Sequence, residues 1–373
     1  MLLKNASIQD IVQSINTLQF VDGEVVMLLF GEKNTPDILA LIDVLNKKSI
    51  SFFGGIFPGV IYGNHWSREG CILVKIQAAI PPVCISGIAS QSLRGLQDID
   101  ANTLNFESGT AVVLLDGLTT NIGHLLENLN DTLGGKCRFI GAGAGSMRLQ
   151  QKPCVFTNHG FKEDAAVVCV MPREIQLGVR HGWEKLAGPL VATATNGNII
   201  SQLNWRTAID VYREIVEADS GKALTKENFI SISPGYPFGI FREKEDDIVR
   251  DPLAFNEKGE IICIGEVRPN TVLHVLKGHP DSLLTAARKA INDCGASPGR
   301  PINAQSTFIV ECITRNLFLG EQFAQEIDLI RENLVVQNET QEPYGVMSLG
   351  EIASYGDGLL ELFNKTIVVG IYS

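Results

Sequence analysis

The sequence lacks the features that would place it in several common classes of protein. It has no run of about 20 apolar residues, which a membrane-spanning helix would need. Residues 1–19 contain one lysine and no unbroken apolar core, so they do not form a signal peptide. Positive charge is scarce, because 31 Lys and Arg stand against 42 Asp and Glu, for a net charge of −11. This balance argues against nucleic acid and anionic membrane surfaces as partners. The missing apolar run and signal peptide favour a cytoplasmic protein without membrane insertion.

The motifs of common catalytic and metal sites are also missing. None of the eight cysteines forms a CxxC pair, and no clustered Cys and His spacing suits zinc. We therefore expect no metal and no cofactor, and we expect buried thiols in a reducing compartment. No GxSxG elbow occurs, and no Ser-His-Asp or Cys-His arrangement is readable from local spacing. The chain is expected not to be an enzyme, with an unrecognised activity left open as an alternative.

The most informative feature that is present is an internal repeat. Three times the chain runs through a strand, a helix, a strand, a Gly-rich turn and a further strand. The three copies begin with the strands at residues 24–30, 110–116 and 306–313, and a partial copy, TVLHVLK with a helix at 281–293, precedes the third. A strand that feeds a helix and returns to a strand buries the helix on one sheet face. The pattern predicts an α/β fold of two packed domains, built from these repeated units with mixed sheets.

The boundary between the two domains is expected near residues 219–228, which gives domains at 1–220 and 221–373. Polar residues and Gly221 interrupt the pattern there, and a new strand is expected at FISIS, residues 229–233. A helix with the sequence WRTAIDVYREIVEA is expected just before the boundary. Its apolar face would consist of Trp205, Ala208, Ile209, Tyr212 and Val216.

The Gly-rich turns are a first candidate binding site. Gly54 and Gly55 belong to the turn of the first copy, and Gly143 and Ser146 to the turn GAGAGS of the second. Glycine permits positive φ and close backbone approach, and binding sites often form beyond strand ends. GAGAGS lacks the GK[ST] ending of a P-loop, and Ser146 stands where a dinucleotide fingerprint has its third Gly. No obvious helix follows, so a tight turn is favoured over phosphate binding.

Three further candidates carry rings. His181 and Trp183 lie two residues apart in VRHGWEKLAGP, and Tyr236 begins the segment YPFGIFREKEDDIVRDP. A single histidine of this kind is often structural. In a pocket, His181 would donate a hydrogen bond to a ligand while Trp183 stacked on it.

Two charged residues complete the candidate site. Residues 244–247 are expected to form a solvated turn, whereas Arg250 follows two apolar residues and needs a carboxylate partner from the protein or from a ligand. Glu351 follows a strand of the third copy. It would serve there as a turn residue, form an ion pair with Arg250, or accept a hydrogen bond from the amine of a ligand. Arg250 and Glu351 together would suit a zwitterion such as an amino acid.

Three long segments of the chain resemble the FIST family. HGWEKLAGPLVATATNGNIISQLNWRTAIDVYREIV resembles the end of its N-terminal half, and SPGYPFGIFREKEDDIVRDPLAFNEKGEIICIGEVRPNTVLHVL the start of its C-terminal half. SLGEIASYGDGLLELFNKTIVVGIY resembles its end, where the family commonly reads Leu-His-Asn-Gln-Thr. Here Asn364 and Thr366 match, while Phe363 and Lys365 depart. The first copy also departs, because FFGGIFPGVIYGN stands where the family often has Gly-Cys-Ser-Thr-Ala-Gly-Glu.

The resemblance implies a sensory domain for signal transduction that binds a small ligand, such as an amino acid or another small carboxylate. FIST domains are often joined to kinase, cyclase or chemoreceptor outputs in bacteria and to an F-box in animals, and no such segment is evident in this sequence. We therefore expect the signal to pass to a separate signalling protein, with homo-oligomerisation as one route. The alternative is a protein–protein adaptor without a small-molecule ligand.

Overall fold

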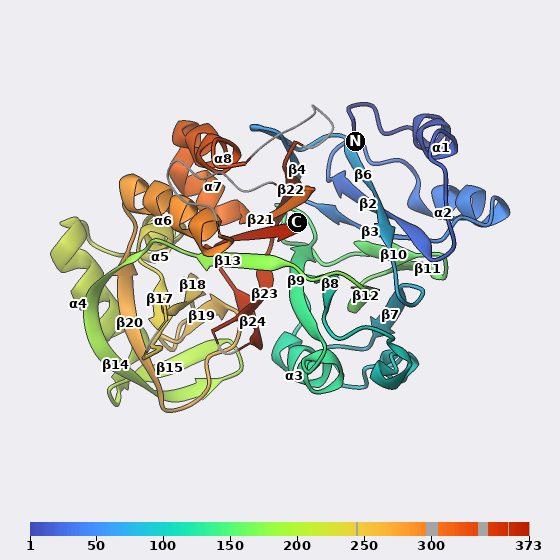
Figure 1. Ribbon diagram of the computed structural model, residues 1–373. Coiled ribbons are helices and arrows are strands. Elements are labelled where there is room, and N and C mark those ends of the chain that lie inside the picture. The colour runs from blue at the N-terminus through green and yellow to red at the C-terminus, as the bar shows by residue number, and fades with distance from the viewer. Residues whose placement is uncertain (244, 296–304, 335–341, 357, 373) are drawn as a thin grey trace.

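The computed structural model describes residues 1–243, 245–295, 305–334, 342–356 and 358–372. Its strands form four sheets, of which three share one pattern and the fourth forms a lobe at one end of the molecule (Figure 1). The combination of helices with mixed sheets confirms the predicted α/β class. Across the described residues, no helix has the length and apolar character that crossing a membrane requires.

All three copies predicted from the sequence are present as structural units. Each unit holds two parallel strands joined by a helical connection, with an antiparallel strand beside the first. Unit 1 consists of β2 (Glu24–Gly31), α2 (Ile38–Lys47), β3 (Phe52–Phe57) and β6 (Cys71–Gln77). Unit 2 consists of β8 (Gly109–Asp116), α3 (Ile122–Leu133), β9 (Cys137–Ala144) and β12 (Ala165–Met171). Unit 3 consists of β21 (Ser306–Cys312), α7 (Ile313–Leu319), α8 (Phe323–Arg331), β22 (Tyr344–Ser348) and β25 (Ile367–Tyr372).

A hairpin that follows the second parallel strand of each unit pairs with a different unit. The hairpin after β3 pairs with β22, the hairpin after β9 pairs with β3, and the hairpin after β22 pairs with β9. These hairpins are β4 (Gly59–Tyr62) with β5 (His65–Ser67), β10 (Val155–Thr157) with β11 (Gly160–Lys162), and β23 (Glu351–Tyr355) with β24 (Leu359–Phe363). The exchange is cyclic, so segments far apart in the sequence are interlocked.

The three sheets have the same strand order as a result of this exchange. An edge strand lies beside the antiparallel strand of each unit: β1 (Leu2–Leu3), β7 (Val83–Ser86) and β13 (Gln176–Arg180). The orders are β1-β6-β2-β3-β10-β11, β7-β12-β8-β9-β23-β24 and β13-β25-β21-β22-β4-β5. The repeated part of the molecule is therefore a threefold arrangement of six-stranded sheets.

Helices cover one face of each of these sheets, and the other faces share a core. α1 (Ile8–Asn16) and α2 pack on the sheet of unit 1, α3 on that of unit 2, and α6 (Pro280–Asp293), α7 and α8 on that of unit 3. The apolar face of α2 is buried, and the helix is capped at its N-terminus by Asp37, whose carboxylate accepts a hydrogen bond from the amide of Ala40 (3.1 Å). The shared core contains residues of all three units, among them Met27, Leu114 and Val310.

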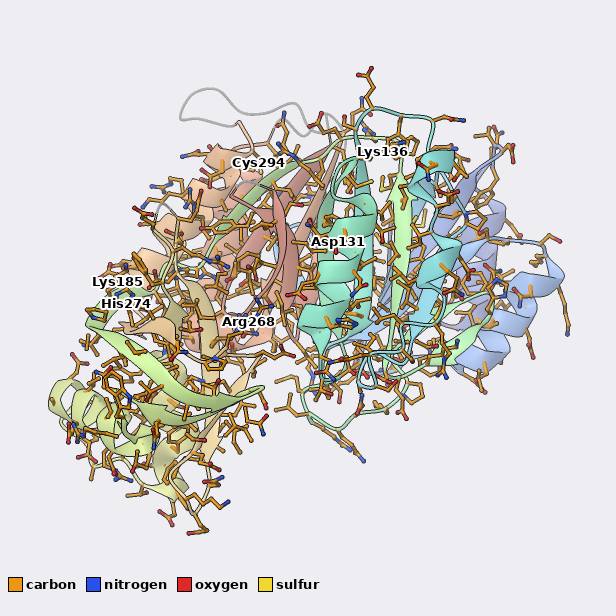
Figure 2. All side chains as sticks on the ribbon, turned by 90° about the horizontal axis from the view of Figure 1, so that it is seen from below. Asp131, Lys136, Lys185, Arg268, His274 and Cys294 are labelled. Atoms are coloured by element: carbon orange, nitrogen blue, oxygen red, sulfur yellow. The ribbon has the colours of Figure 1, made fainter. Side chains whose placement is uncertain are left out.

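The fourth sheet, with α4 (Ala208–Ser220) and α5 (Lys226–Ile232), forms the lobe seen at one end in Figures 1 and 2. Its strands in spatial order are β14 (Glu184–Asn196), β20 (Thr271–Lys277), β17 (Phe238–Ile240), β18 (Ile248–Phe255), β19 (Ile261–Ile264), β15 (Ile199–Leu203) and β16 (Arg206–Thr207). The lobe takes strands from both sides of residue 220. The predicted domain limit there remains a prediction and is not a border between sheets.

Two predictions about elements of the lobe are wrong. Trp205 does not belong to the helix, because it lies in the turn between β15 and β16 with a φ of 61° and is 77% exposed. The segment FISIS is helical instead of extended, since a capping interaction starts α5: the amide of Thr225 donates to the side chain of Asn228 (2.7 Å). The partial copy predicted before the third copy does not form one unit. Its strand, β20, joins the lobe, whereas its helix, α6, packs against β13 and β25 of unit 3.

The turn predicted as solvated is buried in part. Asp247 is 4% exposed, with one carboxylate oxygen 2.6 Å from His274 Nδ1 and the other 3.5 Å from Lys185 Nζ. Lys185 and His274 lie next to each other on the lobe (Figure 2). Asp246 is paired with Arg180 (3.2 Å), and residue 244 lies outside the described residues. Asp246 and Asp247 are therefore held by ion pairs, whereas Glu245 is exposed as predicted.

Candidate functional site

The glycine-rich turns of the three units meet one another and are joined by backbone hydrogen bonds. The amide of Gly143 donates to the carbonyl of Gly350 (2.7 Å), and the amide of Leu349 donates to the carbonyl of Gly143 (2.9 Å). The amide of Gly145 donates to the carbonyl of Ile56 in unit 1 (2.8 Å). These hydrogen bonds occupy backbone amides and carbonyls that would otherwise be available to bind a ligand.

The prediction that Gly54, Gly55 and Gly143 lie in turns is wrong, because they lie within the strands β3 and β9 and are packed tightly there. A Cβ at Gly54 would lie 2.0 Å from the carbonyl oxygen of Leu28 and 2.4 Å from the ring of Phe156 in the hairpin of unit 2, and one at Gly55 would lie 3.0 Å from the ring of Phe57. Ser146 is buried, and its carbonyl accepts from the amide of Leu149 (3.0 Å). The next regular element after Ser146 is the strand β10, so no helix N-terminus faces this turn in the described residues. Close packing between units explains the glycines here.

Arg250 lies buried on β18 and bonds to carbonyl oxygens of three residues. Its Nε donates to Glu266 (2.9 Å), and its Nη1 donates to Val249 (3.0 Å) and to Leu362 (3.0 Å). Burial lowers the pKa of this guanidinium. Its hydrogen bonds therefore go to carbonyl groups and not to the carboxylate that the sequence suggested. The bond to Leu362 ties the lobe to β24.

Glu351 is the first residue of β23 and is fully buried. The hydroxyl of Ser348 donates to its Oε1 (2.5 Å), and the amide of Thr366 donates to its Oε2 (3.2 Å), so neither partner is Arg250. Burial raises the pKa of Glu351 to about 8. The neutral acid fits this site, because the Ser348 hydroxyl also lies 3.3 Å from the carbonyl of Glu311. When Glu351 is protonated, its O–H donates to the Ser348 oxygen, and the Ser348 hydroxyl is then free to donate to the carbonyl of Glu311.

His181 and Trp183 lie together in the loop between β13 and β14, and both are buried. The amide of Trp183 donates to His181 Nδ1 (2.9 Å), and burial lowers the pKa of His181 to about 4. The imidazole is therefore neutral at pH 7, with its hydrogen on Nε2. His181 Nε2 and Trp183 Nε1 have no hydrogen-bond partner among the described residues. Tyr236 differs, since its hydroxyl donates to Asp219 (2.7 Å) within the lobe.

A group of buried charged side chains lies beside Trp183, where the lobe meets unit 3. We call it the buried polar centre. These side chains come from β18, β21, α7, α8, β23 and the loop between β24 and β25, and each residue is at most 3% exposed. The centre consists of Asp251, Glu311, Arg315, Glu326, Glu351 and Lys365.

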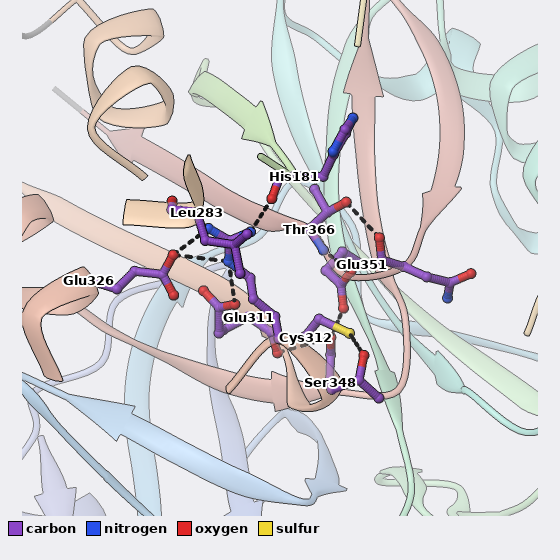
Figure 3. A network of polar contacts seen from close by, with 11 residues as sticks. His181, Leu283, Glu311, Cys312, Glu326, Ser348, Glu351 and Thr366 are labelled. Atoms are coloured by element: carbon purple, nitrogen blue, oxygen red, sulfur yellow. Dashed lines mark hydrogen bonds and ion pairs between the residues drawn. The ribbon is translucent and has the colours of Figure 1, made fainter. Parts of the chain in front are cut away.

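Arg315 organises one half of the buried polar centre. Its Nε donates to Glu326 (2.9 Å) and lies 3.3 Å from Glu311, and its other nitrogens donate to the carbonyls of Leu283 (2.7 Å) and His181 (Figure 3). Burial alone would lower the pKa of Arg315, but the carboxylates of Glu326 and Glu311 raise it. Burial raises the pKa of both acids. Because neither oxygen of Glu311 forms a hydrogen bond in good geometry, Glu311 is the acid that most favours its neutral form.

Lys365 organises the other half. Its Nζ lies 3.1 Å from Asp251 Oδ2 and 5.4 Å from the ring centroid of Trp183. The Nζ is close enough to Asp251 for an ion pair, but its geometry is outside that of a hydrogen bond. Arg315 also faces the indole, with its guanidinium carbon 5.7 Å from the centroid. Trp183 therefore contacts both cations of the buried polar centre.

Five members of this centre are not among the residues predicted from the sequence, although three of the five carry a signal there. Glu311 is an acid inside the otherwise apolar strand STFIVEC, and a buried acid needs a partner or a proton. Asp251 is adjacent to Arg250, and Lys365 is a departure from the family pattern. Arg315 and Glu326 lie on α7 and α8, where charged residues at a helix surface give no such signal.

A groove and most of the cysteines lie outside the buried polar centre. A groove of about 890 Å³ lies apart from the buried polar centre, with Phe20 (39% exposed) and Val21 (65% exposed) in its lining. All eight cysteines are free, and all except Cys84 are buried, as predicted. Among the described residues, no three His, Cys, Asp or Glu side chains are placed to hold a metal ion.

Comparison with protein-family models gives two adjacent matches. The model of the FIST N domain matches residues 9–206, and that of the FIST C domain matches residues 208–354. No curated protein matches the chain. The second match contains every member of the buried polar centre except Lys365, which lies beyond its end.

Proposed function

The chain belongs to the FIST family, whose domains are sensory modules in signal transduction, and from this we propose that it binds a small carboxylate, such as an amino acid, at the buried polar centre. The ligand acts as a cytoplasmic signal that the chain passes to a separate signalling protein. The centre is the best-supported site because it lies at a junction between two parts of the molecule and carries unpaired polar groups.

The buried donors beside Trp183 support a carboxylate as the ligand group. The indole N–H of Trp183 has no hydrogen-bond partner among the described residues, and Lys365 Nζ lies 5.4 Å from the indole ring centroid with an ion pair to Asp251 but no hydrogen bond in good geometry. Each unsatisfied buried polar group costs about 1–3 kcal/mol, and a charge-assisted bond to a carboxylate would remove that penalty. The free oxygens of Glu311 could accept from an amine. The centre thus offers partners for both ends of a zwitterion.

The position of the centre supports a sensory role. Asp251 belongs to the lobe, whereas Glu311 and Lys365 belong to unit 3. A ligand that binds one relative position of these parts better than another shifts the population between them. Further contacts cross the same junction, including Arg242 with Glu361 (2.5 Å). A change at the centre would therefore be transmitted through the whole junction.

A cluster of titratable groups with shifted pKa values is also found in active sites, so the non-enzymatic assignment rests on more than these shifts. The residues of this cluster are buried in the junction and do not line an open cleft. The family is one of sensory modules. Both points support binding without turnover.

A thermal-shift screen with amino acids and other small carboxylates tests the proposal. A ligand at about 100 times its dissociation constant adds about 2.7 kcal/mol of stability. The variant Trp183→Phe keeps an aromatic ring but removes the N–H donor, so it should weaken the response. Tyr236→Phe is a matched control, because the Tyr236 hydroxyl bonds within the lobe to Asp219. An equal response in all three proteins would place the ligand elsewhere.

The alternative function, a protein–protein adaptor, is favoured by the exposed side chains in the groove described above. Phe20 and Val21 present apolar surface there. Replacing both with serine would release a bound partner if the groove is the docking surface, whereas the variant Trp183→Phe would not.

A further inference from the structure

The surroundings of Lys365 have the chemistry of a site for a primary ammonium ion. A buried carboxylate, Asp251, lies 3.1 Å from Nζ, and the face of a buried indole, Trp183, lies 5.4 Å from it. Carboxylates and aromatic faces are the groups that bind free alkylammonium ions. We propose that Asp251 and Trp183 form a primary-ammonium binding site and that Lys365 is its tethered occupant. A free primary amine enters this site only when the lysine side chain is removed or displaced.

The three residues come from separate parts of the chain, so their meeting is not a local contact. Asp251 lies on β18 of the lobe, Trp183 between β13 and β14, and Lys365 in the loop before β25. The Lys365 side chain is fully buried, although lysine is the residue that most readily keeps its charge in water. Its position therefore depends on the carboxylate and the indole and not on solvation.

The backbone at Lys365 is also adapted to this placement. Its φ is 54°, in the left-handed region that non-glycine residues rarely adopt. Bonds on both sides fix the loop, because the Thr366 amide donates to Glu351 (3.2 Å) and the Thr366 hydroxyl donates to the carbonyl of Asn364 (2.9 Å). The loop thus holds an unfavourable conformation that directs the lysine into the site.

Arg315 does not compete for the same role. It faces the same indole, but its guanidinium is held by Glu326 and by the carbonyl of Leu283. Lys365 has the single carboxylate of Asp251 as its ion-pair partner in the described residues. The wild-type junction is therefore closed to primary amines at Asp251, whether or not a carboxylate ligand binds beside it.

Removing the lysine and supplying its missing atoms as a free molecule tests the proposal. Lys365→Ala deletes the atoms from Cγ to Nζ, which n-propylammonium replaces. We expect n-propylammonium chloride to raise the Tm of Lys365→Ala saturably, by a few degrees, relative to potassium chloride at equal concentration. The wild-type protein should show no such difference, because its site is filled. An equal response of the two proteins would overturn the proposal.

Two double variants serve as controls. Adding Asp251→Asn to Lys365→Ala removes the carboxylate and should abolish the saturable response. Adding Trp183→Leu removes the aromatic face and should weaken n-propylammonium binding about fivefold, since an ammonium–indole contact is worth about 1 kcal/mol. The neutral analogue n-propanol should give no response in any of these proteins. Rescue by n-propanol equal to that by n-propylammonium would show that only volume matters.

A second readout applies if Lys365→Ala does not fold. The yield of refolded protein should then rise with n-propylammonium chloride and not with potassium chloride. Lys365→Met fills the same volume without charge and should be less stable than wild type and unresponsive to the amine. If Lys365→Met is as stable as wild type and the amine does not aid refolding of Lys365→Ala, the lysine is only a filler and the proposal fails. These tests use an amine on variants, so their failure leaves the carboxylate screen of the wild-type protein unaffected.

Discussion

The amide of Gly143 donates a hydrogen bond to the carbonyl of Gly350 at 2.7 Å and so joins the end of β9 in unit 2 to the turn before β23 in unit 3. The amide of Leu349 returns a bond to the carbonyl of Gly143 at 2.9 Å. Because the hairpins are exchanged in a cycle, this double contact lies where two units cross. These glycine-rich segments therefore hold the units together through backbone hydrogen bonds.

The close approach at Gly143 predicts a sharp effect of one added methyl group. A Cβ there would lie 3.1 Å from the Cα of Gly117 and 3.1 Å from the carbonyl carbon of Leu349, and both are backbone atoms that cannot swing aside. We expect Gly143→Ala to lower the free energy of unfolding by about 1–3 kcal/mol. Gly135→Ala is the control, since nothing lies within 4 Å of its Cβ position. Urea unfolding measures both, and equal stabilities would refute the packing role.

The ion pairs of Arg315 predict that removing this guanidinium costs much more stability than neutralising Glu311. Arg315→Met leaves Glu326 buried without its counter-charge and the carbonyl of Leu283 without its donor, and we expect it to destabilise the protein by about 3–5 kcal/mol. Glu311→Gln should change stability by only about 1 kcal/mol, because burial already favours the neutral acid. Urea unfolding at neutral pH measures the free energy of unfolding of both variants. A larger loss in Glu311→Gln than in Arg315→Met would contradict this arrangement.

The raised pKa of Glu351 predicts a pH dependence of stability. Burial keeps the pKa of Glu351 at about 8 in the folded protein, whereas the unfolded chain releases this proton near the ordinary glutamate pKa of 4.5. Protonated Glu351 contributes fully to the free energy of unfolding at pH values below its pKa in the unfolded chain. This contribution is lost as the pH rises through its pKa in the folded protein. Relative to Glu351→Gln, the wild type should lose up to about 1.4 kcal/mol per pH unit within that window. Parallel stability curves for the two proteins would show that Glu351 is ionised in the fold.

The two tryptophans discussed above predict contrasting effects of truncation. Trp183 is 4% exposed and packs on Phe318 and on the cations of the buried polar centre. We expect Trp183→Ala to cost about 3–5 kcal/mol. Trp205→Ala should change stability by less than about 0.5 kcal/mol, since this side chain is 77% exposed. Thermal unfolding followed by circular dichroism distinguishes them, and a large loss in Trp205→Ala would place this side chain in a contact.

Local patterns in the sequence predict the units of this fold but not the way they interlock. The apolar strand at residues 24–30 and the stripe Ile38, Leu41, Ile42 and Leu45 are enough to recognise unit 1, because both periodicities are local. The exchange of hairpins is not predictable in the same way, since β4 pairs with β22 across most of the chain. Trp205 was wrongly predicted to lie in the helix, because its spacing in the sequence fits the helical period although the residue lies in the turn before the helix.

The same distinction applies to the candidate site. His181, Trp183 and Glu351 were identified from local context, and the structure places them at or beside the buried polar centre. Arg250 lies close by, but its partners are carbonyl groups that belong to residues distant in the sequence. Lys365 and Asp251 were missed because each looks ordinary alone, and only the fold brings them to 3.1 Å.

Titration of the wild-type protein with the small carboxylates of the screen, with Lys365→Met alongside, tests the sensory account most directly. We predict a saturable rise in thermal stability with at least one carboxylate, and a response at least about tenfold weaker in the variant, because a buried charge-assisted bond contributes about 1.5–3 kcal/mol. An unchanged melting curve across amino acids and other small carboxylates would contradict the account, as would equal affinities of the two proteins.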